Sequence, residues 1–136
     1  MVRRALLPSV PGAVPRAAHF AEAAARDAGF DEATRDRMVL AATEAAANAV
    51  THGNRLDPIR HVVLEWRGGK EGGWLFVEDE GEGLAEQRLT RAALPEDPLD
   101  TGGRGLYILK SLADEIRLER GGRRIGLRFT PRAVLG

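Results

Sequence analysis

The chain has 136 residues, of which 29% are charged and 43% hydrophobic, a balance typical of one globular domain and not of general disorder. The 20 Lys and Arg residues equal the 20 Asp and Glu residues, so no overall basic field for nucleic acid exists. The lack of cysteine excludes disulfides, thiolate chemistry, zinc fingers and iron–sulfur clusters. No apolar run approaches the roughly 20 residues of a membrane span, and the first residues lack the apolar stretch of a signal peptide. We therefore expect a cytoplasmic protein.

The beginning of the chain predicts a strand followed by a helix. Residues 2–7 favour a short strand. Pro15 stands where helices commonly begin, because its φ is already helical, and the alanine-rich residues 16–28 are good helix formers. We expect this helix to end at Gly29, since glycine readily adopts the left-handed conformation that closes a helix.

A second, longer helix follows directly. Asp31 is its expected N-cap, because a carboxylate there can accept a hydrogen bond from the first turn. The helix reaches about His52 and stops at Gly53-Asn54. Its middle, residues 39–50, is apolar almost all round, which predicts that it is largely buried. Its alanines would let a neighbouring backbone approach closely.

After Pro58 the pattern changes from helical to alternating. Residues 59–67 predict a strand, residues 68–73 a glycine-rich hairpin loop, and residues 74–78 the return strand. Residues 84–101 show no clear period, and we expect a loop or mobile lid long enough to suggest a function.

The last third of the chain predicts a helix and a hairpin. The helix covers residues 103–113 and opens on glycines, and residues 115–120 and 123–130 pair across a Gly121-Gly122 turn. In this hairpin apolar residues alternate with Arg and Glu, which predicts one buried face and one face in water. The expected fold is α+β, a two-layer sandwich of a mixed, mostly antiparallel sheet with helices on one face.

Two polar residues interrupt the apolar second helix. Glu44 and Asn48 are four residues apart, so they share one helix face, and His52 continues the row. An amide oxygen is a suitable ligand for Mg²⁺, and a carboxylate beside it can orient or deprotonate a reacting hydroxyl. The spacing also fits an exposed polar stripe without chemistry. For His52 we expect only a helix-end or packing role.

An acidic, glycine-rich segment follows the predicted strand 74–78. Val77 and Asp79 fall on one face of this strand, so Asp79 ends a buried row and its carboxylate needs a hydrogen-bond donor. The exocyclic amine of a purine could be that donor, and Gly81 and Gly83 would let the backbone approach a flat ring. The alternative is an ordinary acidic turn.

A third segment, Gly102-Gly103-Arg104-Gly105-Leu106, opens the last predicted helix. Free backbone N–H groups and the helix dipole favour an anion there, and Arg104 could add positive charge. The pattern is neither a P-loop nor a Rossmann fingerprint. A flexible linker into the helix is the alternative.

Taken in order, the three segments resemble the motifs of the GHKL ATPase superfamily, which includes gyrase B and the catalytic domains of histidine kinases. Its N box and its first and second glycine boxes look like Glu44-x-x-x-Asn48, Asp79-x-Gly81-x-Gly83 and Gly103-x-Gly105-Leu106. Within it, the chain is most similar to the small anti-sigma-factor serine/threonine kinases of bacterial stress and sporulation pathways, whose N box also extends to a His-Gly end.

The resemblance implies the Bergerat ATP-binding sandwich as a single kinase domain over residues 1–136, with residues 84–101 as the ATP lid. It implies ATP and Mg²⁺ as cofactors. Asn48 would hold Mg²⁺, Glu44 would act as the base toward a substrate serine, and Asp79 would accept from the adenine amine. Further cofactor-binding residues would be Gly81 and Gly83 of the first glycine box and Gly103, Arg104, Gly105 and Leu106 of the second.

The resemblance also implies two protein partners. One is an anti-anti-sigma factor of the STAS type, which the kinase phosphorylates. The other is a sigma factor, which the kinase sequesters. Such kinases are often homodimers. One alternative is a nucleotide-dependent binding module, or a switch kinase that regulates a phosphatase without binding a sigma factor. Another is a free-standing domain that phosphorylates histidine. Direct nucleic-acid binding finds no support, because the chain lacks a basic stripe with stacking aromatics.

Overall fold

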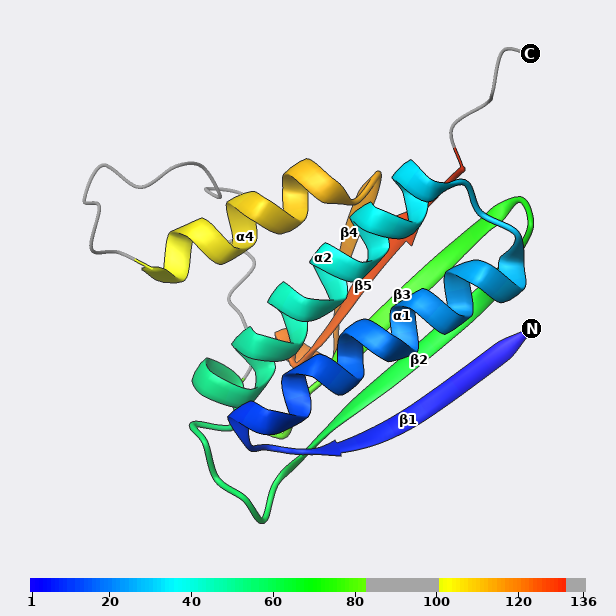
Figure 1. Ribbon diagram of the computed structural model, residues 1–136. Helices are drawn as coiled ribbons and strands as arrows, with labels where there is room; N and C mark the ends of the chain where they lie inside the picture. Colours follow the sequence, from blue (N-terminus) through cyan, green and yellow to red (C-terminus); the bar gives the residue numbers. More distant parts are fainter. Residues whose placement is uncertain (83–100, 132–136) are drawn as a thin grey trace.

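The computed structural model describes residues 1–82 and 101–131, which fold into a sheet with a layer of helices beside it (Figure 1). The elements in chain order are β1 (Val2–Pro8), η1 (Pro11–Ala13), α1 (Val14–Ala28), α2 (Glu32–Asn48), the π-helical turn η2 (Ala49–Gly53), β2 (His61–Gly69), β3 (Gly72–Glu78), α4 (Thr101–Leu112), β4 (Glu115–Glu119), η3 (Arg120–Gly122) and β5 (Arg124–Phe129). No helix among these described residues is long and apolar enough to cross a membrane.

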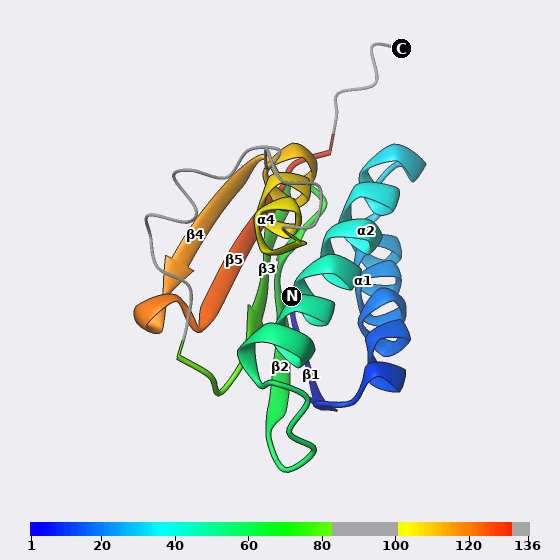
Figure 2. The same cartoon turned by 90° about the vertical axis from the view of Figure 1, so that its left-hand side faces the viewer.

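The five strands form one sheet in the order β1-β2-β3-β5-β4. Each neighbouring pair is antiparallel, which agrees with the predicted, mostly antiparallel sheet, and no parallel pair occurs among the described strands. Helices α1, α2 and α4 all lie on one face of the sheet (Figure 2). The predicted α+β two-layer sandwich is therefore confirmed.

The helical layer is built on alanine. The sides of α1 and α2 that pack together and onto the sheet bury Ala17, Ala21, Ala24, Ala25, Ala28, Ala41, Ala42, Ala45 and Ala46. Small side chains let the helices approach the sheet and each other closely. The predicted helix ends are confirmed: Gly29 closes α1 at φ 77°, and Asp31 caps α2 by accepting from the Thr34 amide at 3.1 Å.

The prediction that residues 39–50 are largely buried is confirmed, with Leu40 as the exposed exception. Leu40 is 57% exposed, and Thr43 turns its hydroxyl back to the Val39 carbonyl at 2.8 Å. The apolar composition of this helix comes mainly from alanine. Alanine is small enough for its buried positions and is also tolerated at its half-buried ones.

The hairpin of β2 and β3 is longer at its tip than predicted and starts later. Residues 57–60 form a turn that leaves Ile59 83% exposed, so β2 begins at His61 and not at residue 59. The strands remain paired up to Gly69 and Gly72, which leaves two residues in the loop. A Cβ at Gly68 or Gly73 would come within 2.6 or 2.9 Å of the buried Trp66 ring. Glycine therefore lets the strands continue past this indole.

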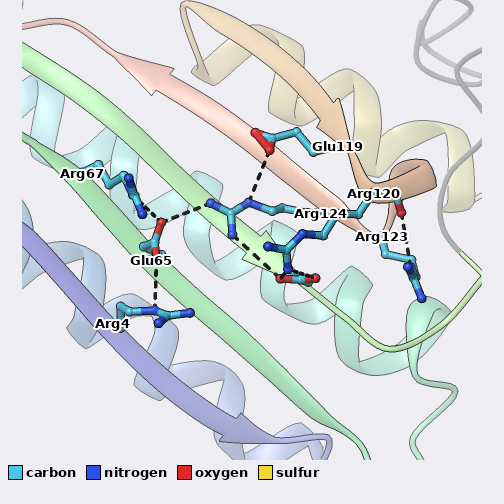
Figure 3. A network of polar contacts seen from close by, with 8 residues as sticks. Arg4, Glu65, Arg67, Glu119, Arg120, Arg123 and Arg124 are labelled. Carbon is cyan, nitrogen blue, oxygen red and sulfur yellow. Dashed lines mark hydrogen bonds and ion pairs between the residues drawn. The ribbon is translucent and has the colours of Figure 1, made fainter.

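The face of the sheet away from the helices is covered by a charged network and not simply by water (Figure 3). Glu65 is buried and lies between the guanidinium groups of Arg4, Arg67 and Arg124 at 3.0, 2.7 and 3.1 Å. Arg124 also covers the ring of Phe76 at 4.0 Å, and both residues are buried. The prediction that the outer face of the last hairpin is wet is thus wrong at Arg124, because long arginine side chains lie flat across the sheet.

The two tryptophans of this hairpin face opposite sides of the sheet. Trp66 packs edge-on to Phe30 in the core, with ring centroids 5.8 Å apart. Trp74 stacks on Phe76 of the outer face at 6.1 Å, and the guanidinium of Arg117 lies 4.5 Å from its ring. Trp66 is therefore a core aromatic, and Trp74 is an aromatic of the outer face of the hairpin.

Candidate functional site

A cavity of about 450 Å³ opens between the end of α2 with its π-helical turn η2, the C-terminal end of β3, the start of β5 and α4. Its apolar walls are Ala45, Ala49, Val77, Leu106, Leu109 and Ile125. Its polar lining includes Asn48, His52, Arg55, Arg60, Asp79, Glu80, Glu82 and Arg123. A lining that combines apolar side chains with polar and charged groups suits a flat ring that carries charged substituents.

Asp79 lies where β3 ends and lines this cavity. Its backbone N–H donates to the Arg123 carbonyl at 2.9 Å, and its Oδ1 accepts from the Gly81 amide at 2.7 Å. Burial raises the pKa of the Asp79 carboxyl above its ordinary value, and the hydrogen bond from Gly81 only partly offsets this. The Gly81 amide is thus the donor that the structure provides for this carboxylate, and its recognition of a purine amine stays a prediction.

Two glycines enclose the Asp79 carboxylate. A Cβ at Gly53, the last residue of η2, would overlap that carboxylate, and a Cβ at Gly81 would overlap the Gly53 carbonyl. The end of the N box and the first glycine box are therefore in direct contact. This contact gives a physical reason for the glycine at the end of the N box, which the sequence indicated only as the end of the helix.

Helix α2 presents Glu44 and Asn48 on one face, but only Asn48 lines the cavity among the described residues. Glu44 lies one turn earlier and is half-buried. The structure thus brings Asn48, Asp79 and Gly81 together and leaves Glu44 outside the described lining. Gly83 lies outside the described residues, as do residues 84–100 of the expected lid.

The last residue of the expected lid, Thr101, is the first residue of α4. The helix thus begins two residues before the predicted start, so Gly103, Arg104 and Gly105 lie within its first turns. Leu106 is buried and forms part of the cavity wall. The glycine segment therefore directly precedes the part of α4 that forms a cavity wall. Its binding of phosphates stays a prediction.

Sequence reasoning missed three arginines at the cavity. Arg55 and Arg60 come from the loop between η2 and β2, and Arg123 comes from the turn before β5. Only the tertiary fold brings these turns to Asp79, so no spacing in the chain could have indicated them. His52, for which no catalytic role is predicted, is exposed and also lines the cavity.

The side chains that line the cavity fit a purine nucleotide with a magnesium ion. The apolar walls suit the base, and the Asp79 carboxylate suits an amine at the edge of the base. In the described part of the chain, no group of three His, Asp or Glu side chains is placed to hold a metal. One amide oxygen, that of Asn48, suits Mg²⁺, which leaves most of its coordination to phosphates and water.

An antiparallel α+β sandwich with a cavity that is lined by the end of one helix and a strand-end carboxylate defines a nucleotide-binding protein of the GHKL type. The chain belongs to the family of histidine kinase-like ATPase domains, which it matches over residues 7–130. Members of this family bind ATP, typically with Mg²⁺. A search among curated proteins found no match.

Proposed function

We propose that the chain is an ATP-dependent protein-serine kinase and anti-sigma factor. It phosphorylates an anti-anti-sigma factor of the STAS type, sequesters a sigma factor and acts as a homodimer. The observation that supports the ATP-dependent part is the half-buried Asp79 carboxylate at the end of β3, which faces a cavity with apolar walls. The partners come from the resemblance to anti-sigma-factor kinases, whose extended N box matches residues 44–53.

In this proposal each residue has a separate task. Asp79 accepts a hydrogen bond from the adenine amine, and the walls from α2 and α4 hold the base. Asn48 holds Mg²⁺, and the N–H groups at the start of α4 bind phosphates, because the N-terminal end of a helix favours anions. Bound ATP would supply the transferable phosphoryl group and leave as ADP, and bound Mg²⁺ would neutralise part of the phosphate charge. Glu44 orients the serine hydroxyl of the partner and takes its proton.

The alternative is a nucleotide-dependent binding module, or a switch kinase that regulates a phosphatase. One observation favours the binding module: Glu44 does not reach the cavity among the described residues, whereas Asn48 does. A chain that binds nucleotide without transferring phosphate would have this geometry.

Phosphate transfer to a STAS-domain protein separates these functions. The measurement uses ATP labelled at its γ-phosphate with Mg²⁺, followed by acid treatment of the product. We expect acid-stable phosphoserine, and we expect Glu44→Gln to bind ATP normally but to transfer phosphate about 100-fold more slowly. Asp36→Asn, which removes an exposed carboxylate from the same helix, is the matched control and should transfer at the wild-type rate.

Each other outcome points to a different assignment. Wild-type transfer by Glu44→Gln would remove Glu44 as the base. Acid-labile product would indicate phosphohistidine. ATP binding without any transfer would support the binding module, and a pull-down that captures a phosphatase and not a sigma factor would support the switch kinase.

A further inference from the structure

Asn54, the residue after η2, is a fully buried polar residue with every polar atom of its side chain paired. Its Nδ2 donates to Ser9 Oγ at 2.5 Å and to the His61 carbonyl at 2.9 Å, and its Oδ1 accepts from the Glu80 amide at 2.7 Å. The side chain thus connects the loop after β1, the start of β2 and the turn after β3.

The backbone beside Asn54 is strained. Arg55 and Leu56 both have positive φ, 52° and 60°, a conformation that is unfavourable for non-glycine residues. The Asn54 amide donates to the Ala49 carbonyl and the Leu56 amide to the Val50 carbonyl, each at 2.8 Å. Such a pair persists only where the surrounding contacts determine the conformation. These two backbone bonds and the side-chain bonds of Asn54 are contacts of this kind.

We propose that Asn54 is a positioning residue that fixes the Asp79 carboxylate for recognition of the base. This inference rests on the proposed nucleotide-binding function. Asp79 lies between two backbone restraints: its own N–H donates to Arg123, and the N–H of the next residue, Glu80, donates to Asn54. Asn54 does not line the cavity among the described residues, so it acts through the Glu80 turn and not by touching nucleotide.

The chemistry of the Asn54 side chain provides a graded set of variants. Asn54→Ala loses all three bonds. Asn54→Asp keeps an acceptor for the Glu80 amide but loses both donors and adds a buried charge. Ser9→Ala removes only one bond, on the side away from Asp79, and Ser9 is as fully buried as Asn54. All three variants lower stability, but only Asn54→Ala removes the restraint on Glu80.

Calorimetric titration with ADP and with inosine diphosphate reads out the position of Asp79, because hypoxanthine has a carbonyl where adenine has its amine. We expect the wild-type chain to prefer ADP. We expect Asn54→Ala to reduce the ADP-to-IDP affinity ratio about tenfold, the loss of one hydrogen bond, and Asn54→Asp and Ser9→Ala to keep the ratio. Thermal melts show how much stability each variant loses.

An unchanged ratio in Asn54→Ala, or an equal loss in all three variants, would overturn the positioning role. A wild-type chain without preference for ADP would overturn the proposed base recognition, and the inference with it. If Asn54→Ala does not fold, hydrogen exchange of the Glu80 amide in the wild-type chain still tests the positioning role of Asn54. ADP should slow this exchange and IDP should not, and equal exchange in both would refute the proposal.

Discussion

At the scale of single residues, the charged carboxylate of Asp79 is unfavourable for folding but is the form that the proposed nucleotide binding needs. Its carboxyl pKa is raised by burial, so the folded chain binds a proton there more readily than the unfolded chain does. Its contribution to the unfolding free energy is therefore complete below the ordinary pKa of Asp and is lost as the pH rises through the raised pKa. A nucleotide amine as hydrogen-bond donor would compensate the buried charge at neutral pH.

Asp79→Asn should raise the thermal midpoint of the nucleotide-free chain at pH 7 and weaken ADP binding by at least about tenfold, because the amide removes the buried charge and adds a donor that faces the adenine amine. Thermal melts and calorimetric titration measure the two effects. The difference in stability between wild type and variant should shrink as the pH falls. A variant that is less stable at pH 7 and binds ADP normally would contradict this account of Asp79.

The spacing of the motifs predicts Asn48, Asp79 and Gly81 because each lies on a regular helix or directly after a strand, where the period determines the face. Arg55, Arg60 and Arg123 could not be predicted, because they lie in turns that meet only in the folded chain. A four-residue spacing on a helix determines the common face of two residues but not which of them reaches a cavity. For this reason the spacing did not indicate that Asn48 lines the cavity and that Glu44 is not among its described lining residues.

At the scale of elements, the contact between η2 and the turn after β3 determines the site. Gly53→Ala should weaken ADP binding about tenfold, because the added Cβ overlaps the Asp79 carboxylate and displaces it. Gly12→Ala is the matched control, since a Cβ there meets no atom within 4 Å and the backbone needs no glycine. Normal ADP binding by Gly53→Ala, measured by calorimetry, would show that the carboxylate has room to move.

The ends of the elements could be predicted where one residue has a strong local preference. Gly29 and Asp31 close and open helices through local hydrogen bonds. The start of β2 could not be predicted, because Ile59 has a high strand propensity but lies in a turn that the loop geometry requires. The glycines of the β2–β3 hairpin suggest a loop, whereas the contact with Trp66 makes them strand residues.

At the scale of the whole molecule, the two faces of the sheet have different chemistry. The helical side is apolar, and the outer side carries the Glu65 network. Burial opposes ionisation of Glu65, but hydrogen bonds from Arg67 and Arg124 outweigh it, so its pKa lies below its ordinary value. The stability that Glu65 contributes is therefore complete above the ordinary Glu pKa and is lost as the pH falls through the lowered one.

Glu65→Gln should reduce the unfolding free energy at pH 7 by about 3 kcal/mol, because it leaves buried Arg124 without its main carboxylate. The variant should also lose less stability than the wild type between neutral and acid pH. Urea unfolding at several pH values measures both effects. Glu22→Gln, which affects only an exposed ion pair on α1, should change the unfolding free energy by less than about 0.5 kcal/mol. An acid dependence in Glu65→Gln equal to that of the wild type would refute the role of Glu65.

The opposite orientation of the two tryptophans on one hairpin provides the molecule with two separate fluorophores. Trp66 is fully buried, so its emission follows the packing of the helices on the sheet. Trp74 lies on the outer face beneath Arg117, so its emission follows the surroundings of that face. A chain with Trp74→Phe therefore reports core unfolding alone, and a chain with Trp66→Phe reports events on the outer face, without any added label.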